Sequence, residues 1–164
     1  MCIRDSSYTI EDSLYPTVKF IDNDTIACFG DKDIRLYTMV EEPKEKTVID
    51  LEGREMQGVF YNSTCVGYIA LADSGSGSKY KIYTYGSNGS QKSVVSYSDS
   101  YDKIYAAQDE IIVVGDMDCS IFRLNGSTKF KYSFPKKLVN VVPDANKEEY
   151  VVISESETQI IALK

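Results

Sequence analysis

The chain repeats one pattern of strands and turns four times along its 164 residues. In each unit an apolar strand runs into a short polar break, followed by a second strand, a tight turn and a third strand that ends in aliphatic or aromatic residues. The units open at Thr17–Phe20, Gly58–Tyr61, Lys103–Ala106 and Leu138–Val141. Their spacing of roughly 35 to 46 residues is typical of blades that stack on their neighbours. The sequence therefore predicts an all-β fold, a β-propeller of four-stranded antiparallel blades.

The units occupy about residues 17–56, 57–101, 102–136 and 137–164, which gives about three and three-quarter blades because the fourth unit lacks a last strand. In the first unit the expected strands are Thr17–Ile21, Thr25–Phe29, Ile34–Met39 and Thr47–Leu51, and in the second they are Gly58–Tyr61, Val66–Ala72, Tyr80–Tyr85 and Lys92–Tyr97. In the third unit they are Lys103–Ala106, one strand within Glu110–Asp118, one within Ile121–Gly126, and Lys129–Phe134. In the fourth unit they are Leu138–Val142, Tyr150–Ile153 and Gln159–Leu163.

The turn Gly30–Asp33 joins the second and third strands of the first unit. We expect Gly30 to supply a positive φ and the aspartates to bond their own backbone, as hairpin turns require. Glu110–Asp118 repeats Thr25–Asp33 closely, so the third unit should turn in the same way.

Residues 1–6, Met-Cys-Ile-Arg-Asp-Ser, match the translation of a sequencing-library adapter. We interpret them as an adapter scar and set them aside before fold reasoning. Residues 7–164 are then a partial propeller, the C-terminal fragment of a longer chain. The alternative is a natural N-terminus that happens to have this sequence.

The composition of 43% hydrophobic and 26% charged residues suits a chain that buries a core. No apolar run approaches the ~18 residues that a membrane span requires. The net charge of −7 argues against nucleic acid as a partner, because phosphate binding needs clustered Lys and Arg. Partners should be neutral or basic.

The chain has no His and no Trp. A WD-repeat blade uses Gly-His and Trp-Asp pairs, and a quinoprotein repeat uses Trp to dock its blades and stack its cofactor, so neither repeat matches. Without His, no Ser-His-Asp or Cys-His arrangement can form. We therefore expect no catalytic residue, no cofactor and no metal site in this chain.

Carboxylates are the catalytic groups that remain. The best placed are the turn acids Asp31, Asp33, Asp116 and Asp118, which could ligate Ca²⁺ or pair as general acid and base. Their spacing lacks the alternating oxygen ligands and terminal Glu of a calcium loop. We interpret them as hairpin-turn residues.

The cysteines give no disulfide framework. Cys2 belongs to the adapter scar, and the odd set Cys28, Cys65 and Cys119 lies in different blades without a Cys-x-x-Cys spacing. We expect small buried core residues, which free cysteines commonly are.

Two further residue types mark the strands. Lys92, Lys129 and Lys131 fall on fourth strands, where a charge discourages strand addition. The second and third blades carry many tyrosines, which we assign to packing between blades, with a ligand surface as the alternative. These are Tyr80, Tyr83, Tyr85, Tyr97, Tyr101 and Tyr105.

Ile121–Gly126, and less closely Ile82–Gly86 and Ile160–Leu163, resemble the repeated Val-Tyr-Ala-Leu-Asn strand of quinoprotein-like propellers, which precedes a Gly. With Tyr15–Phe20 and Gly30–Asp33, they make the chain similar to the C-terminal half of an uncharacterised propeller family of Gram-positive bacteria, a domain of unknown function. The resemblance implies a short cytoplasmic stretch and one membrane helix ahead of an extracytoplasmic propeller. It carries over no catalytic residue.

The function that we predict is non-enzymatic: an extracytoplasmic interaction, sensor or scaffold module at the bacterial surface. Its partner would be a protein or cell-surface ligand, and it would contact the membrane only through an upstream anchor. One alternative is a fragment of a quinoprotein-like or lactonase-like propeller enzyme with its catalytic residues in the missing half. Another is a purely structural spacer.

Closure of the ring has two interpretations. Tyr8–Ile10 either completes the fourth blade in a small four-bladed ring, or it is the remnant of a truncated blade and the partner of Gln159–Leu163 lies in the missing N-terminal half. We favour truncation. An open arc exposes apolar blade faces and an unpaired edge, so the fragment alone should be unstable or self-associate.

We expect the turn acids to bind Ca²⁺ only weakly, because one Gly-Asp-x-Asp turn cannot supply the six to eight oxygens that Ca²⁺ takes. Titration calorimetry should show no micromolar binding. A micromolar dissociation constant that Asp116→Ala abolishes would contradict this.

Overall fold

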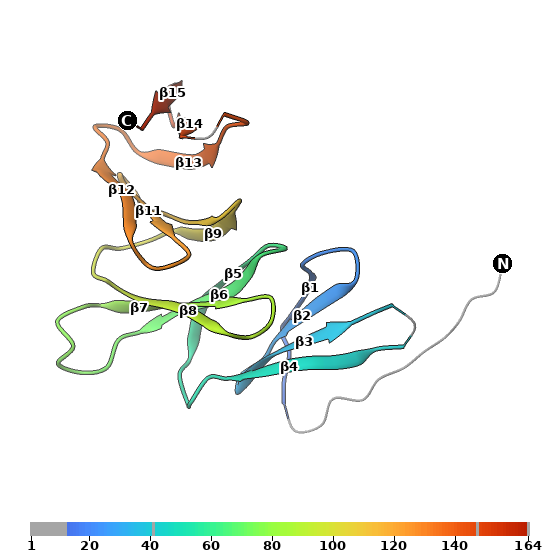
Figure 1. The fold of residues 1–164 in the computed structure, drawn as a ribbon. Helices are drawn as coiled ribbons and strands as arrows, with labels where there is room; N and C mark the ends of the chain where they lie inside the picture. Colours follow the sequence, from blue (N-terminus) through green and yellow to red (C-terminus); the bar gives the residue numbers. More distant parts are fainter. Residues whose placement is uncertain (1–12, 41, 147, 164) are drawn as a thin grey trace.

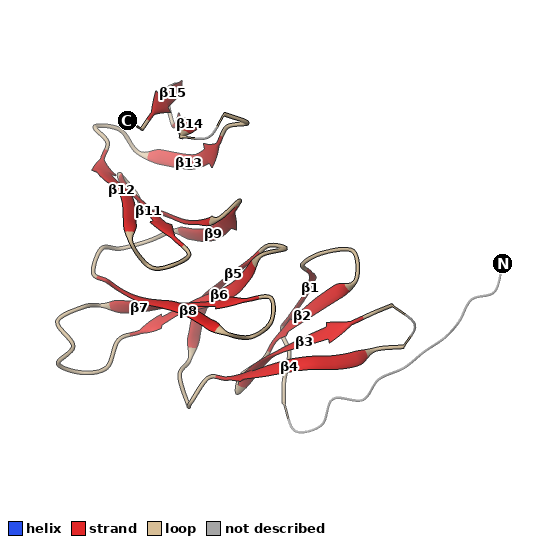
Figure 2. Ribbon diagram, in the orientation of Figure 1, coloured by secondary structure: helices blue, strands red, loops and turns tan. Residues whose placement is uncertain are grey.

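The computed structural model describes residues 13–40, 42–146 and 148–163, and every regular element in these ranges is a β-strand (Figures 1 and 2). The described ranges accordingly contain no helix that could span a membrane. The strands form sheets of four, four, four and three strands, each in simple chain order and antiparallel. This confirms the all-β propeller of about three and three-quarter blades.

The strand bounds lie close to those predicted. Blade 1 contains β1 (Thr17–Phe20), β2 (Thr25–Phe29), β3 (Asp33–Thr38) and β4 (Lys44–Asp50); blade 2 contains β5 (Met56–Tyr61), β6 (Cys65–Leu71), β7 (Tyr80–Gly86) and β8 (Gln91–Tyr97); blade 3 contains β9 (Lys103–Ala107), β10 (Glu110–Val114), β11 (Asp118–Arg123) and β12 (Thr128–Ser133); blade 4 contains β13 (Leu138–Pro143), β14 (Glu149–Ser154) and β15 (Thr158–Ala162).

The glycines of two turns are required for space, and the expected positive φ at Gly30 is wrong. Neither Gly30 nor Gly115 has a positive φ. A Cβ on Gly30 would lie 2.7 Å from Cε1 of Tyr15, and a Cβ on Gly115 would lie 2.7 Å from the carbonyl oxygen of Ser100. In both blades the segment that leads into the first strand passes close to the turn glycine, so a side chain at the glycine position would collide with this segment.

The three complete blades share a bulge that the sequence did not reveal. Between the third and fourth strands the register shifts so that one residue of the fourth strand is unpaired, and this residue is Lys46, Lys92 or Lys129. In blade 1 the ladder continues beyond the bulge and pairs Tyr37 with Glu45. β4 therefore begins before the expected Thr47.

Three buried clusters hold neighbouring blades together. They join blades 1 and 2, blades 2 and 3, and blades 3 and 4, and none of them joins blade 1 to blade 4 within the described ranges. Examples of residues that share a cluster are Phe29 with Tyr68, Ile82 with Val113, and Ile121 with Val152. The blades follow one another along an open arc with blades 1 and 4 at its ends (Figure 1). Tyr8–Ile10, the predicted closing or remnant strand, lies outside the described residues.

Both ends of the arc present apolar sheet faces. On blade 1, Val18 and Phe20 point away from blade 2 and are 52% and 65% exposed. On blade 4, Val142, Val151 and Ile160 form one cross-strand row, and Ile160 is 64% exposed. Such faces associate in water because burial removes apolar surface from solvent.

We expect the chain to self-associate with rising concentration, and Phe20→Lys and Ile160→Lys to reduce the association by placing a charge on an end face. Sedimentation velocity over a concentration series measures this. Leu71→Lys is the control, since Leu71 is 58% exposed on a middle blade. A chain that stays monomeric throughout, or an equal effect of Leu71→Lys, would show that the end faces are not responsible.

Candidate peptide-binding groove

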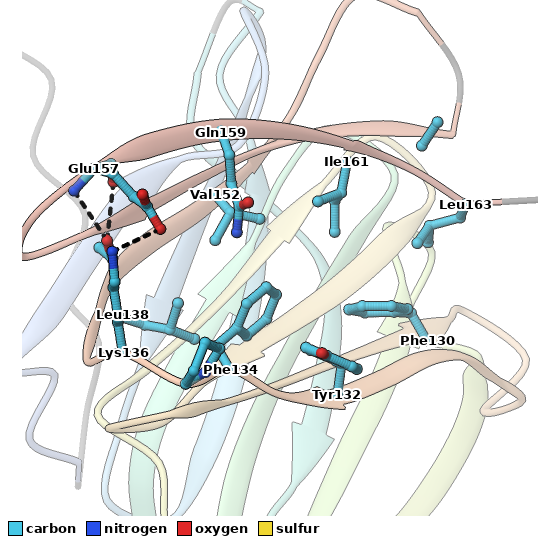
Figure 3. A pocket seen from close by; sticks show the side chains of 13 residues that line it. Phe130, Tyr132, Phe134, Lys136, Leu138, Val152, Glu157, Gln159, Ile161 and Leu163 are labelled. Carbon is cyan, nitrogen blue, oxygen red and sulfur yellow. Dashed lines mark hydrogen bonds and ion pairs between the residues drawn. The ribbon is translucent and has the colours of Figure 1, made fainter.

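A groove runs along the outer edge of the molecule between the last strand of blade 3 and the sheet of blade 4. Its volume is about 390 Å³. Phe130, Tyr132 and Phe134 of β12 and the following loop form one wall, and Val152 of β14 and Ile161 of β15 lie on the other (Figure 3). The groove is thus lined mainly by apolar side chains, as sites for organic and peptide ligands usually are.

The aromatic wall follows from strand geometry. Residues two apart on a strand point to the same side, so Phe130, Tyr132 and Phe134 line up. The rings of Phe130 and Tyr132 lie 6.1 Å apart at 23°, and those of Tyr132 and Phe134 lie 4.8 Å apart at 78°. Phe134 is 5% exposed, whereas Tyr132 is 52% exposed. Tyr132 is therefore the ring that a ligand can cover.

One end of the groove carries a charged pair. Lys136 Nζ lies 3.0 Å from Glu157 Oε1, and both side chains are about half exposed. An exposed pair of this kind contributes little to stability, about 0–1 kcal/mol. The groove is polar at this end, where Gln159 also lies, and apolar toward Ile161 and Leu163 (Figure 3).

A second hollow of about 390 Å³ lies between the same blades on one rim, and it contains a partly buried ion pair. Lys129 Nζ lies 2.6 Å from Glu110 Oε1 and 2.8 Å from the Tyr150 hydroxyl, and this hydroxyl donates to Glu110 Oε2 at 2.5 Å. Each member bonds the other two. We interpret this triad as a clamp that joins blade 4 to blade 3.

The clamp raises the pKa of two of its members. Burial raises the pKa of Tyr150, and its bond to Glu110 adds to this. Burial alone would lower the pKa of Lys129, but bonds to Glu110 and Tyr150 outweigh it and raise it. Raised folded-state pKa values give stability that is fully present below the ordinary values of about 10 and lost as pH rises through the raised ones.

The turn acids are placed singly and do not form a site. Asp31 Oδ1 accepts the Leu14 N–H at 3.1 Å, and Asp116 lies 3.5 Å from Lys137 Nζ. Asp33 and Asp118 close their turns, because the N–H groups of Gly30 and Gly115 donate to their carbonyls at 2.8 and 2.7 Å. Each is also the first residue of a strand, β3 or β11, and pairs with the following strand.

The side chain of Asp33 is a buried acceptor. It accepts the hydroxyl of Tyr15 at 2.6 Å and the Nε–H of Arg35 at 3.1 Å. Burial, with the Asp33 bond, raises the pKa of Tyr15 to about 12. The described ranges contain no group of three His, Cys, Asp or Glu side chains that could hold a metal ion.

The cysteines are buried core residues, as predicted. Cys28, Cys65 and Cys119 are free thiols with at most 5% of their surface exposed. Burial raises the pKa of Cys65 to about 11 and that of Cys119 to about 12. Thiols with such pKa values stay protonated and are poor nucleophiles at neutral pH.

The tyrosines pack between blades, which confirms the preferred interpretation. Tyr83 and Tyr85 stack on Tyr68 with ring centroids 4.8 and 6.3 Å away, inside the cluster of blades 1 and 2. Tyr97 meets Phe122 of blade 3 edge to face at 6.2 Å. The remaining members follow the same pattern: Tyr80 and Tyr101 meet at 5.2 Å, and Tyr105 packs against the cluster of blades 3 and 4.

The lysine interpretation is wrong at one position. Lys131 is 58% exposed and pairs with Asp99 at 2.6 Å, as suits an outer edge. Lys129, however, is turned inward to the clamp and is 13% exposed. Sequence reasoning also missed Phe130, Tyr132 and Phe134, although their alternation within β12 was visible.

Comparisons with known proteins agree with the fold. A model of a family of unknown function, DUF5711, matches residues 5–163. None of the curated proteins compared matches the chain. Solved β-propellers match it in structure, and at this identity they show the fold alone.

Three of these structures illustrate the likeness. Hsv2 of Kluyvelomyces marxianus has a TM-score of 0.64 and 11% identity, with 98% of this chain and 50% of that chain covered. BBS1N, crystallised with ARL6DN, has a TM-score of 0.61 and 8% identity, with 95% of this chain and 54% of that chain covered. BamB of Moraxella catarrhalis has a TM-score of 0.55 and 10% identity, with 90% of this chain and 42% of that chain covered. The chain spans about half the length of these propellers.

We expect Lys129→Ala to destabilise the protein by about 2–4 kcal/mol, because it leaves the carboxylate of Glu110, which is only 13% exposed, without its cation. Lys131→Ala, the matched control on the same strand, should cost about 0–1 kcal/mol. Urea unfolding measures both. If both variants lose the same small amount of unfolding free energy, the clamp contributes no more to stability than an exposed ion pair.

Proposed function

The chain belongs to the DUF5711 family of unknown function, and we propose that it is a non-enzymatic module that binds a protein ligand in the groove between β12 and β15. We place this module at the extracytoplasmic face of a bacterial membrane, a location that rests on the family resemblance. Its scaffold is the stacked blades, which hold the two walls of the groove at a fixed distance.

Tyr132 is the observation that carries the proposal. This residue is 52% exposed, and its ring lies between the rings of Phe130 and Phe134 and faces an apolar wall across the groove. Tyrosines in such surroundings commonly dominate the binding energy of protein interfaces, because they bury a large apolar area and keep a polar tip.

The chemistry of the described side chains favours binding over catalysis. The thiols and phenols whose pKa shifts all have raised values, so burial holds them in their protonated forms. Glu110, a partly buried carboxylate in the second hollow, has both oxygens engaged by Lys129 and Tyr150. Nucleophilic and general-base catalysis need the opposite, a lowered pKa or a free base.

Selection from a phage-displayed library of random peptides against the 164-residue chain tests the proposal. We expect enriched peptides that bind Tyr132→Ser ~10-fold more weakly, a loss of ~1.4 kcal/mol. Val94→Ser is the matched control, since Val94 is 43% exposed on the fourth strand of blade 2. Failure to enrich peptides, or peptides indifferent to Tyr132→Ser, would refute binding in this groove.

A further inference from the structure

We propose that the second hollow binds a small zwitterion of about the size of a free amino acid. Its carboxylate pairs with Arg123, and its ammonium group pairs with the carboxylates of Asp109 and Glu148. The proposal goes beyond the peptide-binding groove, because none of the described residues lines both sites. It is carried by the shape of the hollow, by the charges that line it and by two strained backbone positions.

Turns on one rim of blades 3 and 4 enclose the hollow. Between blades 2 and 3 the corresponding turns meet closely, because Asn62 Nδ2 donates to the Gln108 carbonyl at 2.7 Å. Between blades 3 and 4 the side chain of Gln108 spans the gap, and its Nε2 lies 3.5 Å from the Asp144 carbonyl. The space of about 390 Å³ that opens beside this contact is in the range of small-molecule sites.

The clamp lines this hollow and offers a ligand no unpaired charge. Lys129 and Glu110 neutralise each other at 2.6 Å, and the hydroxyl of Tyr150 bonds to both of them. The Lys129 and Glu110 side chains are 13% exposed, and Tyr150 is 1% exposed. A charged ligand must therefore be met by the other residues that line the hollow.

Arg123 is a cation without a carboxylate partner among the described residues. It lies directly opposite Glu110 in the β10–β11 ladder, a placement in which opposite charges attract each other. Lys129, which the bulge leaves unpaired in its ladder, holds Glu110 instead. The guanidinium of Arg123 keeps a 3.5 Å contact with the Ser127 hydroxyl, and its fork of donors suits a ligand carboxylate.

Two carboxylates that line the hollow lack a cation in the described part of the chain. Asp109 lies in the turn before β10, and Glu148 lies in the turn before β14. The ion pairs of the described residues include neither of them. One guanidinium and two carboxylates thus surround the hollow without neutralising one another.

The backbone is strained at two positions that line the hollow. Gln108 has a φ of 53° and Glu148 a φ of 79°, in the left-handed region that favours glycine. Neighbouring turns on this rim use glycine there, at Gly89 and Gly126. Two of the three described non-glycine residues with a positive φ therefore line one hollow, and strain of this kind clusters at ligand sites.

The charges select a zwitterion. Asp109 and Glu148 would repel a ligand that carries only negative charge, and Arg123 would repel one that carries only positive charge. A molecule with both charges gains an attraction at each end. A free amino acid is the simplest ligand of this class that a space of this size admits.

The remaining lining suits such a ligand better than a sugar. Asn125 and Asn146 contribute amide groups, and Leu124 and Pro143 contribute apolar contacts for a carbon skeleton. Sugars commonly stack on an exposed aromatic face. Tyr150, the aromatic residue among the described lining residues, is 1% exposed and offers no such face.

Chemical-shift mapping of the 164-residue chain by NMR, with each of the standard L-amino acids added in turn, tests the proposal. We expect at least one of them to bind saturably and to shift the backbone amides of residues 108–110, 123–125 and 148–150. Acetylating its amino group, or converting its carboxylate to a carboxamide, should weaken binding ~10-fold or more, because each change removes one charge.

Variants separate the two ends of the ligand. Arg123→Gln should weaken the free amino acid ~10-fold and abolish its advantage over the carboxamide form. The double variant Asp109→Asn/Glu148→Gln should abolish the advantage over the acetylated form. Lys92→Gln and Glu42→Gln are the matched controls, since each removes one exposed charge outside the hollow, and both should bind as the unaltered chain does.

Absence of saturable binding at ~10 mM, a concentration that would fill even a millimolar site, would overturn the proposal. Equal binding of the blocked forms, or undiminished binding by the Arg123 and acidic variants, would overturn it too. Tyr132→Ser alters the groove and should leave amino-acid binding unchanged. If this variant abolishes the binding, the ligand lies in the groove and the hollow is not its site.

Discussion

Mutual covering of sheet faces is the interaction on which this structure depends. Each blade is apolar on both faces, so neighbouring blades stabilise it by removing these faces from water. Ile82 and Ile121 are fully buried by the following blade, while Ile160 at the same position of blade 4 is 64% exposed. Burying one isoleucine side chain contributes about 1.5–3 kcal/mol. The ends of the arc are therefore the places where this molecule has interaction energy left to gain.

Local pattern was enough to predict the fold. Alternation of apolar and polar residues determines where strands lie, and the repeated Gly-Asp-x-Asp turns determine where they reverse, so the predicted strands match the observed ones within a few residues. The reason given for Gly30 was nevertheless wrong. A turn sequence reveals where the chain reverses. The close approach of Tyr15 to Gly30 depends instead on the segment before β1, which is not part of the β2–β3 hairpin.

Features set by contacts between blades could not be predicted in this way. Strict alternation puts Lys129 and Phe130 on opposite faces of β12, yet both contact blade 4, because the bulge leaves Lys129 unpaired and turns it inward. The groove had a visible signal in the alternating aromatics of β12. That signal became a site only when the structure showed that Tyr132 stays half exposed.

Exposed aromatic surface and an uncharged strand edge are both liabilities, since each invites association with other chains. The fourth strands of blades 1 and 2 carry exposed bulge lysines, Lys46 and Lys92, whereas Lys129 of blade 3 is turned into the clamp and β15 has no charge. The unprotected edge and the uncovered ring thus occur together.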